Sequence, residues 1–365
     1  MSVQSNTDAA RARDGSRVLL ADCDIHPAPA RDDSLDPYLG ARWAGHRRAF
    51  GERRHAGSAY PRQHPNAARL DSWPPEGGPP GSSLDFLRRQ HLDRWGVDVG
   101  VLTPLLSSGE LLDLEFSAAH ARAVNEWQCS EWLDPEPRLR GSIVVAYEDG
   151  ALAAAEIRRQ AADSRFVQVL LVVRTLEPLG RRRYWPMYDA AQECGLPIGI
   201  HFGGYGGNPL TGAGFPSFYV EEHAGTATAF QDQVISMVCE GVFQRFPRLQ
   251  VVLIEGGVAW MPPLMWRLDR AWARMRAEVP HLDRLPSEVV RAHFWLTTQP
   301  IEEPPLERDF LEMLDELDMD DQLMFATDYP HWDFDAPDRA FPRSVSDERR
   351  RKFLGTNAAR LYGVR

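Results

Sequence analysis

Features of membrane, secreted and nucleic-acid-binding proteins are missing from this sequence. No apolar run approaches the roughly 20 residues that a membrane-spanning helix needs. Residues 1–16 contain no apolar stretch of a signal peptide, so we expect a disordered leader and a cytoplasmic location. The 41 basic residues are outnumbered by 52 acidic ones, and the net charge of -11 argues against a nucleic-acid partner. We therefore expect neither a nucleic acid nor a membrane as partner, but a small-molecule substrate.

Cysteine is also scarce. The four cysteines are Cys23, Cys129, Cys194 and Cys239, and they are widely separated with no CxxC pair. This spacing argues against a disulfide framework and against a zinc site built from cysteine thiolates. We expect free, reduced thiols.

Short apolar runs of strand length recur along the chain, and helical stretches separate most of them. The runs are residues 17–26, 97–104, 139–147, 166–173, 196–202, 249–255, 293–299 and 323–328. This alternation predicts one (β/α)8 barrel domain over residues 17–365, with eight parallel strands. The alternative, an open doubly wound sheet, expects a glycine-rich turn after the first strand, but the turn here, DCDIHPAP, has no glycine.

Two long segments interrupt this alternation and make the predicted barrel a distorted one. The first, from about residue 45 to 83, is rich in Arg, Pro and Gly, and the second, GGYGGNPLTGAGFPSFYVEEHAG, follows the fifth run. Both come after strands that carry candidate site residues, so we expect them to cover the barrel mouth as lids. For the first segment, the alternative to a lid is a flexible insertion without a function at the site.

Acids and histidines stand at the ends of four apolar runs. Asp24 and His26 end the first run, His201 the fifth and Asp328 the eighth, and Glu255 ends the sixth. Ionisable groups at the ends of buried strands carry a solvation cost, and in a barrel the strand ends converge. The mixture of imidazole and carboxylate suits a divalent metal: zinc, manganese or iron. The alternative for each residue alone is a buried, hydrogen-bonded side chain.

These motifs together resemble the amidohydrolase superfamily. The resemblance is specific to the amidohydrolase-related branch that includes aminocarboxymuconate semialdehyde decarboxylase and the hydroxybenzoate decarboxylases, and it runs from about Val18 to Gly363. It is carried by DCDIHP, IGIHFGG, VVLIEGGVAW, ATDYPHWD and FLGTNAARLYG. The resemblance implies a barrel enzyme whose metal is held by Asp24, His26, His201 and Asp328.

The chain departs from the family pattern at two positions. Asp24 replaces the first histidine of the superfamily's His-x-His, as in some decarboxylases of the branch. Glu255 stands where characterised decarboxylases carry a histidine that acts on the substrate. We expect Glu255 to be a general base for metal-bound water or a ligand of a second metal ion. The alternative is that Glu255 accepts hydrogen bonds from the glycine-rich turn that follows it.

Further polar and aromatic residues lie beside the motifs. As additional acid, base or nitrogen ligands we consider His331 and His223, and also Asp22, which has the alternative of pointing away from the barrel axis or capping a backbone amide. As substrate contacts we consider Tyr205, Glu222, Trp332, Gln299, Arg267, Tyr147, Phe202 and Phe334. Arg267 has two possible roles, anchoring a substrate carboxylate or pairing with Asp269.

The leading functional hypothesis is hydrolysis of a small organic acid, amide or lactone by metal-activated water, with Glu255 taking the proton. Three alternatives stay open. The first is a decarboxylase (lyase) of an aromatic or enoic acid with His223 or His331 as the acid, and the second is a dinuclear non-haem iron oxygenase. The third is a non-catalytic structural subunit that partners an active paralogue. One or two metal ions per chain and a homo-oligomer or hetero-oligomer are compatible with these hypotheses.

Overall fold

The computed structural model describes residues 17–53, 61–204 and 208–364, so the predicted leader lies outside the described residues. Eight parallel strands form one sheet in the order β1-β2-β3-β4-β5-β6-β7-β8. The strands are β1 (Ala21–Ile25), β2 (Val99–Leu102), β3 (Leu139–Val144), β4 (Phe166–Arg174), β5 (Ile198–Gly204), β6 (Val251–Ile254), β7 (Phe294–Thr297) and β8 (Leu323–Met324). Each falls within or overlaps one of the eight apolar runs, so the strand prediction is confirmed.

The sheet closes between its first and last strands. The Cys23 N–H donates to the Phe325 carbonyl at 3.0 Å, and the His26 N–H donates to the Tyr329 carbonyl at 2.8 Å. These bonds join β1 to the segment after β8, which makes the fold the predicted (β/α)8 barrel. The closure also brings the site-bearing ends of β1 and β8 together.

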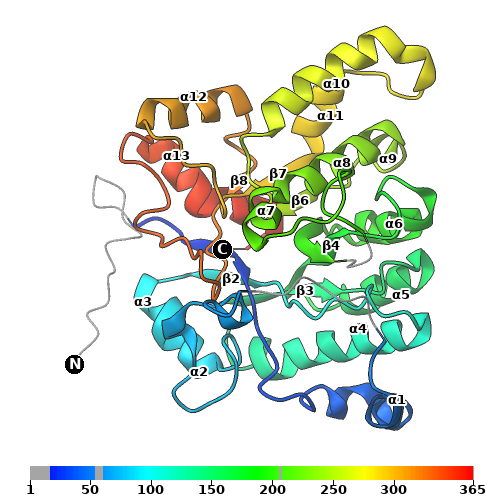
Figure 1. Ribbon diagram of the computed structural model, residues 1–365, viewed down its shortest axis with the longest axis vertical. Coiled ribbons are helices and arrows are strands. Elements are labelled where there is room, and N and C mark those ends of the chain that lie inside the picture. Colours follow the sequence, from blue (N-terminus) through cyan, green and yellow to red (C-terminus); the bar gives the residue numbers. More distant parts are fainter. Residues whose placement is uncertain (1–16, 54–60, 205–207, 365) are drawn as a thin grey trace.

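Helices surround the barrel (Figure 1). The α-helices are α1 (Asp36–Phe50), α2 (Leu84–Leu87), α3 (Asp93–Trp95), α4 (Leu114–Gln128), α5 (Gly150–Gln160), α6 (Trp185–Cys194), α7 (Tyr219–Ala224), α8 (Thr226–Cys239), α9 (Val242–Arg245), α10 (Met261–Met275), α11 (Pro286–His293), α12 (Glu307–Leu317), α13 (Asp347–Arg351) and α14 (Asn357–Tyr362). The shorter 3-10 and π segments are η1 (Pro65–Ala67), η2 (Leu70–Ser72), η3 (Arg88–Leu92), η4 (Cys129–Leu133), η5 (Arg182–Tyr184), η6 (Arg276–Glu278) and η7 (Lys352–Thr356). Within the described residues, no helix combines the length and apolarity of a membrane span.

Local sequence explains why strands and helices begin where they do. Every residue of β4 is buried, as expected of a parallel strand that is covered on both faces. Helices α4 and α5 begin after Asp113 and Asp149, whose carboxylates accept hydrogen bonds from the first free backbone N–H groups of each helix. Strand β4 is thus fully buried, and side-chain caps satisfy the N-termini of α4 and α5.

The barrel interior is filled near the beginnings of the strands. Ala21, Val99 and Val167 belong to one buried cluster with Ala358 and Tyr362 of α14. The Tyr362 hydroxyl donates to Gln168 Oε1 at 2.9 Å, so its polar group is satisfied inside the core. Because α14 covers this end, the carboxyl ends of the strands are left to form a site.

The first of the two long segments, from about residue 45 to 83, contacts the carboxyl end of the barrel. The backbone N–H of Trp332 donates to the Ala67 carbonyl at 2.7 Å, and the backbone N–H of Arg69 donates to the Pro330 carbonyl at 3.0 Å. Residues 54–60 of the segment lie outside the described residues. The contacts place part of the segment beside the loop after β8, and its action as a lid stays a prediction.

Candidate metal centre and cavity

Four residues from three strand ends meet at the carboxyl end of the barrel. Asp24, His26, His201 and Asp328 each offer one ligand atom, and these atoms lie within 4.8 Å of one another. All four residues are buried, with exposed fractions of 0 to 4%. We call these four residues the metal group. The sequence selects the same four.

The short contacts within the metal group are between nitrogen and oxygen. His26 Nε2 lies 2.7 Å from Asp328 Oδ1, and His201 Nε2 lies 3.3 Å from Asp24 Oδ2. On the opposite edge of each ring, Nδ1 donates to a backbone carbonyl, His26 to Thr103 at 2.7 Å and His201 to Phe202 at 2.6 Å. A carbonyl oxygen only accepts, so Nδ1 carries the hydrogen and Nε2 is the atom that is left for a ligand.

Buried polar atoms of the metal group lack hydrogen-bond partners among the described residues. These atoms are Asp24 Oδ2, His201 Nε2 and Asp328 Oδ2. Buried polar atoms are normally satisfied, so three orphaned ligand-type atoms in one cluster fit a cation between them. The donor set of two imidazoles and two carboxylates suits zinc, manganese or iron.

Electrostatics support the same conclusion. Burial alone would lower the pKa of His26, but Asp24 and Asp328 outweigh it and raise this pKa to about 9. Burial would raise the pKa of Asp24, but His26 and His201 lower it to about 2. The carboxylates therefore stabilise a positive charge at this point, whether that charge is a proton or a metal ion.

Glu255 adjoins the metal group from the end of β6. Its Oε2 lies 3.2 Å from His201 Nε2. Burial, followed by the nearby Asp328 carboxylate, raises the pKa of Glu255 well above its usual range. Glu255 and Asp328 both adopt left-handed backbone conformations, with φ of 64° and 60°. Such strain in residues other than glycine concentrates at functional sites.

Two N–H groups of the glycine-rich turn donate to a residue other than Glu255. The Val258 and Ala259 N–H groups of that turn donate to Glu302 Oε2, at 2.9 and 3.0 Å. Glu255 instead forms a second group of carboxylates with Asp328 and Asp333, whose ligand atoms lie within 4.8 Å of one another.

Asp22 faces away from the metal group. Its carboxylate accepts hydrogen bonds from His91 Nε2 at 2.7 Å and from the Thr327 N–H at 2.9 Å. It also accepts from the Asp24 N–H at 3.2 Å. The alternative prediction for Asp22, capping of backbone amides, is therefore confirmed.

The two histidines predicted as further acids or ligands, His331 and His223, make different contacts. His331 Nδ1 lies 2.5 Å from Asp328 Oδ1, and its ring stacks on His26 with 4.4 Å between centroids. His223 Nε2 lies 2.9 Å from Asp333 Oδ2, and Asp333 separates it from the metal group. His331 therefore contacts the metal group directly, whereas His223 contacts Asp333.

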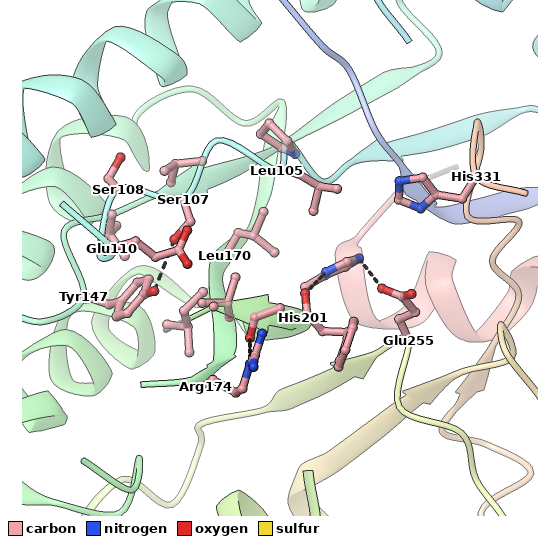
Figure 2. Close-up of a pocket in the computed structure, with 18 of the residues that line it drawn as sticks. Leu105, Ser107, Ser108, Glu110, Tyr147, Leu170, Arg174, His201, Glu255 and His331 are labelled. Carbon is pink, nitrogen blue, oxygen red and sulfur yellow. Dashed lines mark hydrogen bonds and ion pairs between the residues drawn. The ribbon is translucent and has the colours of Figure 1, made fainter. Parts of the chain in front are cut away.

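A cavity of about 280 Å³ opens onto the metal group. Glu255, His201 and His331 line one part of it, and Figure 2 shows all three facing the same space. Its wall is largely apolar. The apolar lining includes Pro104, Leu105, Val144, Val145, Leu170, Leu171, Val172 and Phe202.

The predicted substrate contacts divide into three sets. Glu222 and Tyr147 line the cavity, as does Phe202. Gln299 is buried and donates to the Asp333 carbonyl at 3.3 Å, outside the lining, and Trp332 is 36% exposed and stacks on His64. Tyr205 lies outside the described residues.

The Arg267 prediction needs correction. This side chain is exposed on α10 and is not part of the cavity lining. Nor does Asp269 serve as its partner, because the Asp269 carboxylate accepts hydrogen bonds from the Ser287 N–H and hydroxyl, at 2.9 and 2.6 Å. Neither expected role of Arg267 has a basis in these contacts.

Several residues of the site were not among those predicted from the sequence. Arg174 ends β4 and lines the cavity with an exposed fraction of 8%, and its Nη2 lies 3.6 Å from Glu222. Its signal was available, because it is the charged residue at the end of the fourth apolar run. Asp333 lies within the ATDYPHWD motif, but periodicity gives no reason to select it. Glu110 lines the cavity from an irregular loop, where no sequence pattern identifies it.

Comparisons with known proteins agree with this geometry. A protein-family model described as Amidohydrolase matches residues 21–364. A gamma-resorcylate decarboxylase from Polaromonas sp. (strain JS666 / ATCC BAA-500) is 26% identical over 291 residues, which cover 74% of this chain and 85% of the relative.

Solved structures share the fold. An amidohydrolase from Mycobacterium avium subsp. paratuberculosis K-10 has a TM-score of 0.71 and 22% identity, with 95% of this chain and 98% of that chain covered. A dihydroxybenzoic acid decarboxylase from Polaromonas sp. JS666, with bound manganese and the inhibitor 2-nitroresorcinol, has a TM-score of 0.66 and 20% identity, with 95% and 96% covered. At these identities the likeness shows the fold.

Proposed function

This chain belongs to the amidohydrolase family, and we propose that it is a metal-dependent decarboxylase of a small aromatic carboxylic acid. The sequence favours hydrolysis first, because Glu255 replaces the decarboxylase histidine. The curated relative at 26% identity is a decarboxylase, and this supports the alternative over hydrolysis. We therefore place decarboxylation ahead of hydrolysis.

One observation carries the proposal: the largely apolar cavity opens directly onto the metal group. His201 belongs to both, because it is one of the four clustered residues and also part of the cavity lining. A flat aromatic ring suits apolar walls such as Leu170 and Val172, and its carboxylate then faces the buried polar end. The same molecule would thus satisfy both parts of the site.

The four residues of the metal group would hold one divalent ion. Manganese is our first choice, because the Polaromonas structure contains it, and zinc and iron suit the same ligands. When bound, such an ion supplies Lewis-acid stabilisation of negative charge on substrate oxygens. Thr103 and Phe202 hold the two imidazoles in the ligating tautomer through their backbone carbonyls.

Decarboxylation also needs a proton. The bond between the ring carbon and the carboxylate breaks and carbon dioxide leaves. The ring carbon keeps the electron pair of that bond and takes up a proton from the protein or water. Glu255 lines the cavity, and burial together with the nearby Asp328 carboxylate raises its pKa well above the usual range, which favours the protonated side chain. We assign this proton to the ring carbon. His331 also lines the cavity, and we assign it to hold Asp328 in place through their 2.5 Å contact.

A second candidate function is favoured by the carboxylate group of Glu255, Asp328 and Asp333. Three carboxylates around one point would suit a second ion, and two iron ions would then support oxygen activation. This oxygenase reading predicts about two irons per chain and oxygen uptake with substrate. The decarboxylase reading predicts one ion and no oxygen uptake.

The direct test uses a panel of hydroxybenzoates and other aromatic acids that carry ¹³C in the carboxyl group. The manganese-loaded protein in D₂O is expected to release ¹³C-labelled carbon dioxide and to place one deuterium on the ring carbon. Asp328→Asn should abolish release, whereas Asp338→Asn, on the same loop but with its carboxylate outside the metal group, is the matched control. Turnover of amides or lactones without any release of carbon dioxide would overturn the proposal in favour of hydrolysis.

A further inference from the structure

The turn after β6 holds the proposed proton donor in a strained backbone conformation. Glu255 begins this turn, and its φ of 64° lies in the left-handed region that residues other than glycine rarely adopt. Its side chain meets His201, as Figure 2 shows. A strained residue keeps its conformation only where the surrounding structure holds it. The contacts that hold this turn therefore decide where the Glu255 carboxyl group lies.

The beginning of the turn is held by β7, by α8 and by the turn's own last residue. The Glu255 N–H donates to the hydroxyl of Thr297, the last residue of β7, at 3.1 Å. Gly256 lies against the Phe230 ring of α8, where an added Cβ would be 3.1 Å from that ring. The Trp260 indole N–H donates to the Gly256 carbonyl at 2.7 Å. These contacts fix the first two residues of the turn.

The end of the turn is held by one carboxylate from the loop after β7. Glu302 Oε2 accepts hydrogen bonds from two consecutive backbone N–H groups, that of Val258 at 2.9 Å and that of Ala259 at 3.0 Å. Hydrogen bonds to an ionised carboxylate are about twice as strong as those between neutral groups. Both N–H groups precede α10, so Glu302 fastens the chain between the strained residue and the helix.

The close approach of Glu302 depends on a glycine and on an anchored loop. At Gly257, whose φ is 68°, an added Cβ would lie 2.6 Å from Glu302 Oε1. The loop that carries Glu302 is bonded to the segment after β8, because Thr298 Oγ1 accepts from the Ala326 N–H at 3.2 Å. Glu302 thus links the turn after β6 to a loop that is itself fixed to the barrel.

We propose that Glu302 is a positioning residue whose carboxylate clamps the end of the turn and so keeps the Glu255 carboxyl group at its place beside His201. The catalytic consequence rests on the proposed function, because that function assigns proton transfer to Glu255. Among the described residues, Glu302 belongs neither to the cavity lining nor to the metal group, so it acts through Glu255. Loss of the clamp lets the turn relax and displaces the proton donor.

Amide hydrogen exchange at single-residue resolution tests the clamp without any assumption about the reaction. In Glu302→Ala the N–H groups of Val258 and Ala259 lose their acceptor, and we expect the Glu255 N–H to exchange at least about tenfold faster as well. Glu302→Gln keeps an acceptor oxygen, so exchange at Glu255 should stay within about threefold of the unmodified protein. Faster exchange at Val258 and Ala259 alone would overturn the inference.

Initial rates of carbon dioxide release test the catalytic consequence. A displacement of about 1 Å costs up to about 10²-fold in rate, so kcat of Glu302→Ala should fall about 10- to 100-fold. KM and manganese content should stay within about threefold, because Glu302 contacts neither substrate nor metal. Glu302→Gln should keep most of the activity, and Glu303→Ala, which removes the exposed acid next in sequence, is the matched control. If Glu302→Ala does not fold, Glu302→Asp, shorter by one methylene, should show the same effects in smaller size.

A double variant separates positioning of Glu255 from a general weakening of the structure. Glu255→Gln combined with Glu302→Ala should be no slower than Glu255→Gln alone, within about twofold, because a side chain that has no proton to give loses nothing when it is displaced. A purely structural effect of Glu302 would multiply the two losses. That result would overturn the inference.

The proposed function and the clamp fail separately. If the unmodified protein releases no carbon dioxide from any aromatic acid, the proposed function is refuted, and exchange at the Glu255 N–H still decides the clamp. Release of carbon dioxide with unchanged kcat in folded Glu302→Ala would refute only the clamp.

Discussion

Replacing Glu255 by Gln tests the proton-transfer assignment most sharply. Glutamine has nearly the shape of a protonated glutamic acid, so the contact of this side chain with His201, at 3.2 Å in the unmodified protein, is kept. What is lost is the transferable proton. General acid catalysis typically contributes about 10²- to 10⁴-fold, equivalent to about 3 to 5 kcal/mol in the activation free energy. We expect kcat for release of carbon dioxide to fall by that factor.

Two further readouts separate this role from the others. The manganese content and the Kd for a non-reactive aromatic acid should stay within about threefold of the unmodified protein, since neither depends on proton transfer. Glu307→Gln, an exposed acid in the first turn of α12, is the matched control. More than one tenth of the activity remaining in Glu255→Gln would refute the role of Glu255 as proton donor. Loss of an ion from the variant would instead assign Glu255 to the metal.

Four other predictions concern the contacts around the site. Because the pKa of His26 is raised to about 9, metal binding below pH 9 should displace at least one proton from the protein, and the metal affinity should rise about tenfold per pH unit up to pH 9. Calorimetry in buffers of different ionisation enthalpy measures the number of protons released. Metal binding without proton release would contradict this prediction. The raised pKa of His26 also stabilises the metal-free fold by about 3 kcal/mol below pH 6.5, the ordinary pKa of histidine. This contribution is lost as the pH rises through 9. Urea unfolding of the protein stripped of metal by a chelator should therefore give a smaller free energy of unfolding at pH 9.5 than at pH 6. Asp22→Asn should weaken metal binding about 10- to 100-fold in a competition assay with a fluorescent chelator, because the Asp22 carboxylate accepts from the backbone N–H groups of both Asp24 and Thr327. An unchanged metal affinity would show that Asp22 does not position the ligands. Gly109→Ala should lower the free energy of unfolding by about 1 to 3 kcal/mol in urea titrations, because its Cβ would meet the Tyr147 ring, and a variant as stable as the parent would contradict the packing.

The barrel and the metal group could be predicted because parallel strands are recognisable in sequence. Their apolar runs are continuous, so a charged residue at a run's end stands out, as His201 and Asp328 do. The closure of the barrel then brings those ends together. No further information is needed to propose these residues as ligands.

Residues on loops and helices could not be placed in the same way. The helical position of Arg267 says which neighbours share its face but not that this face points to solvent. His223 stands in a suggestive motif, yet its distance from the metal group depends on how α7 packs, and Asp333 lies between. Glu110 depends on a loop whose path is set by the contact of Gly109 with Tyr147, a long-range fact that local sequence does not contain.

The measurement that tests the central claim is stoichiometric reactivation. The protein is stripped of metal with a chelator, and manganese is added back in steps while release of carbon dioxide from an aromatic acid is recorded under nitrogen. The account predicts no activity without metal, a linear rise to one ion per chain and a plateau beyond it, with no need for oxygen. Activity in the stripped protein, or a requirement for two ions and oxygen, would contradict it.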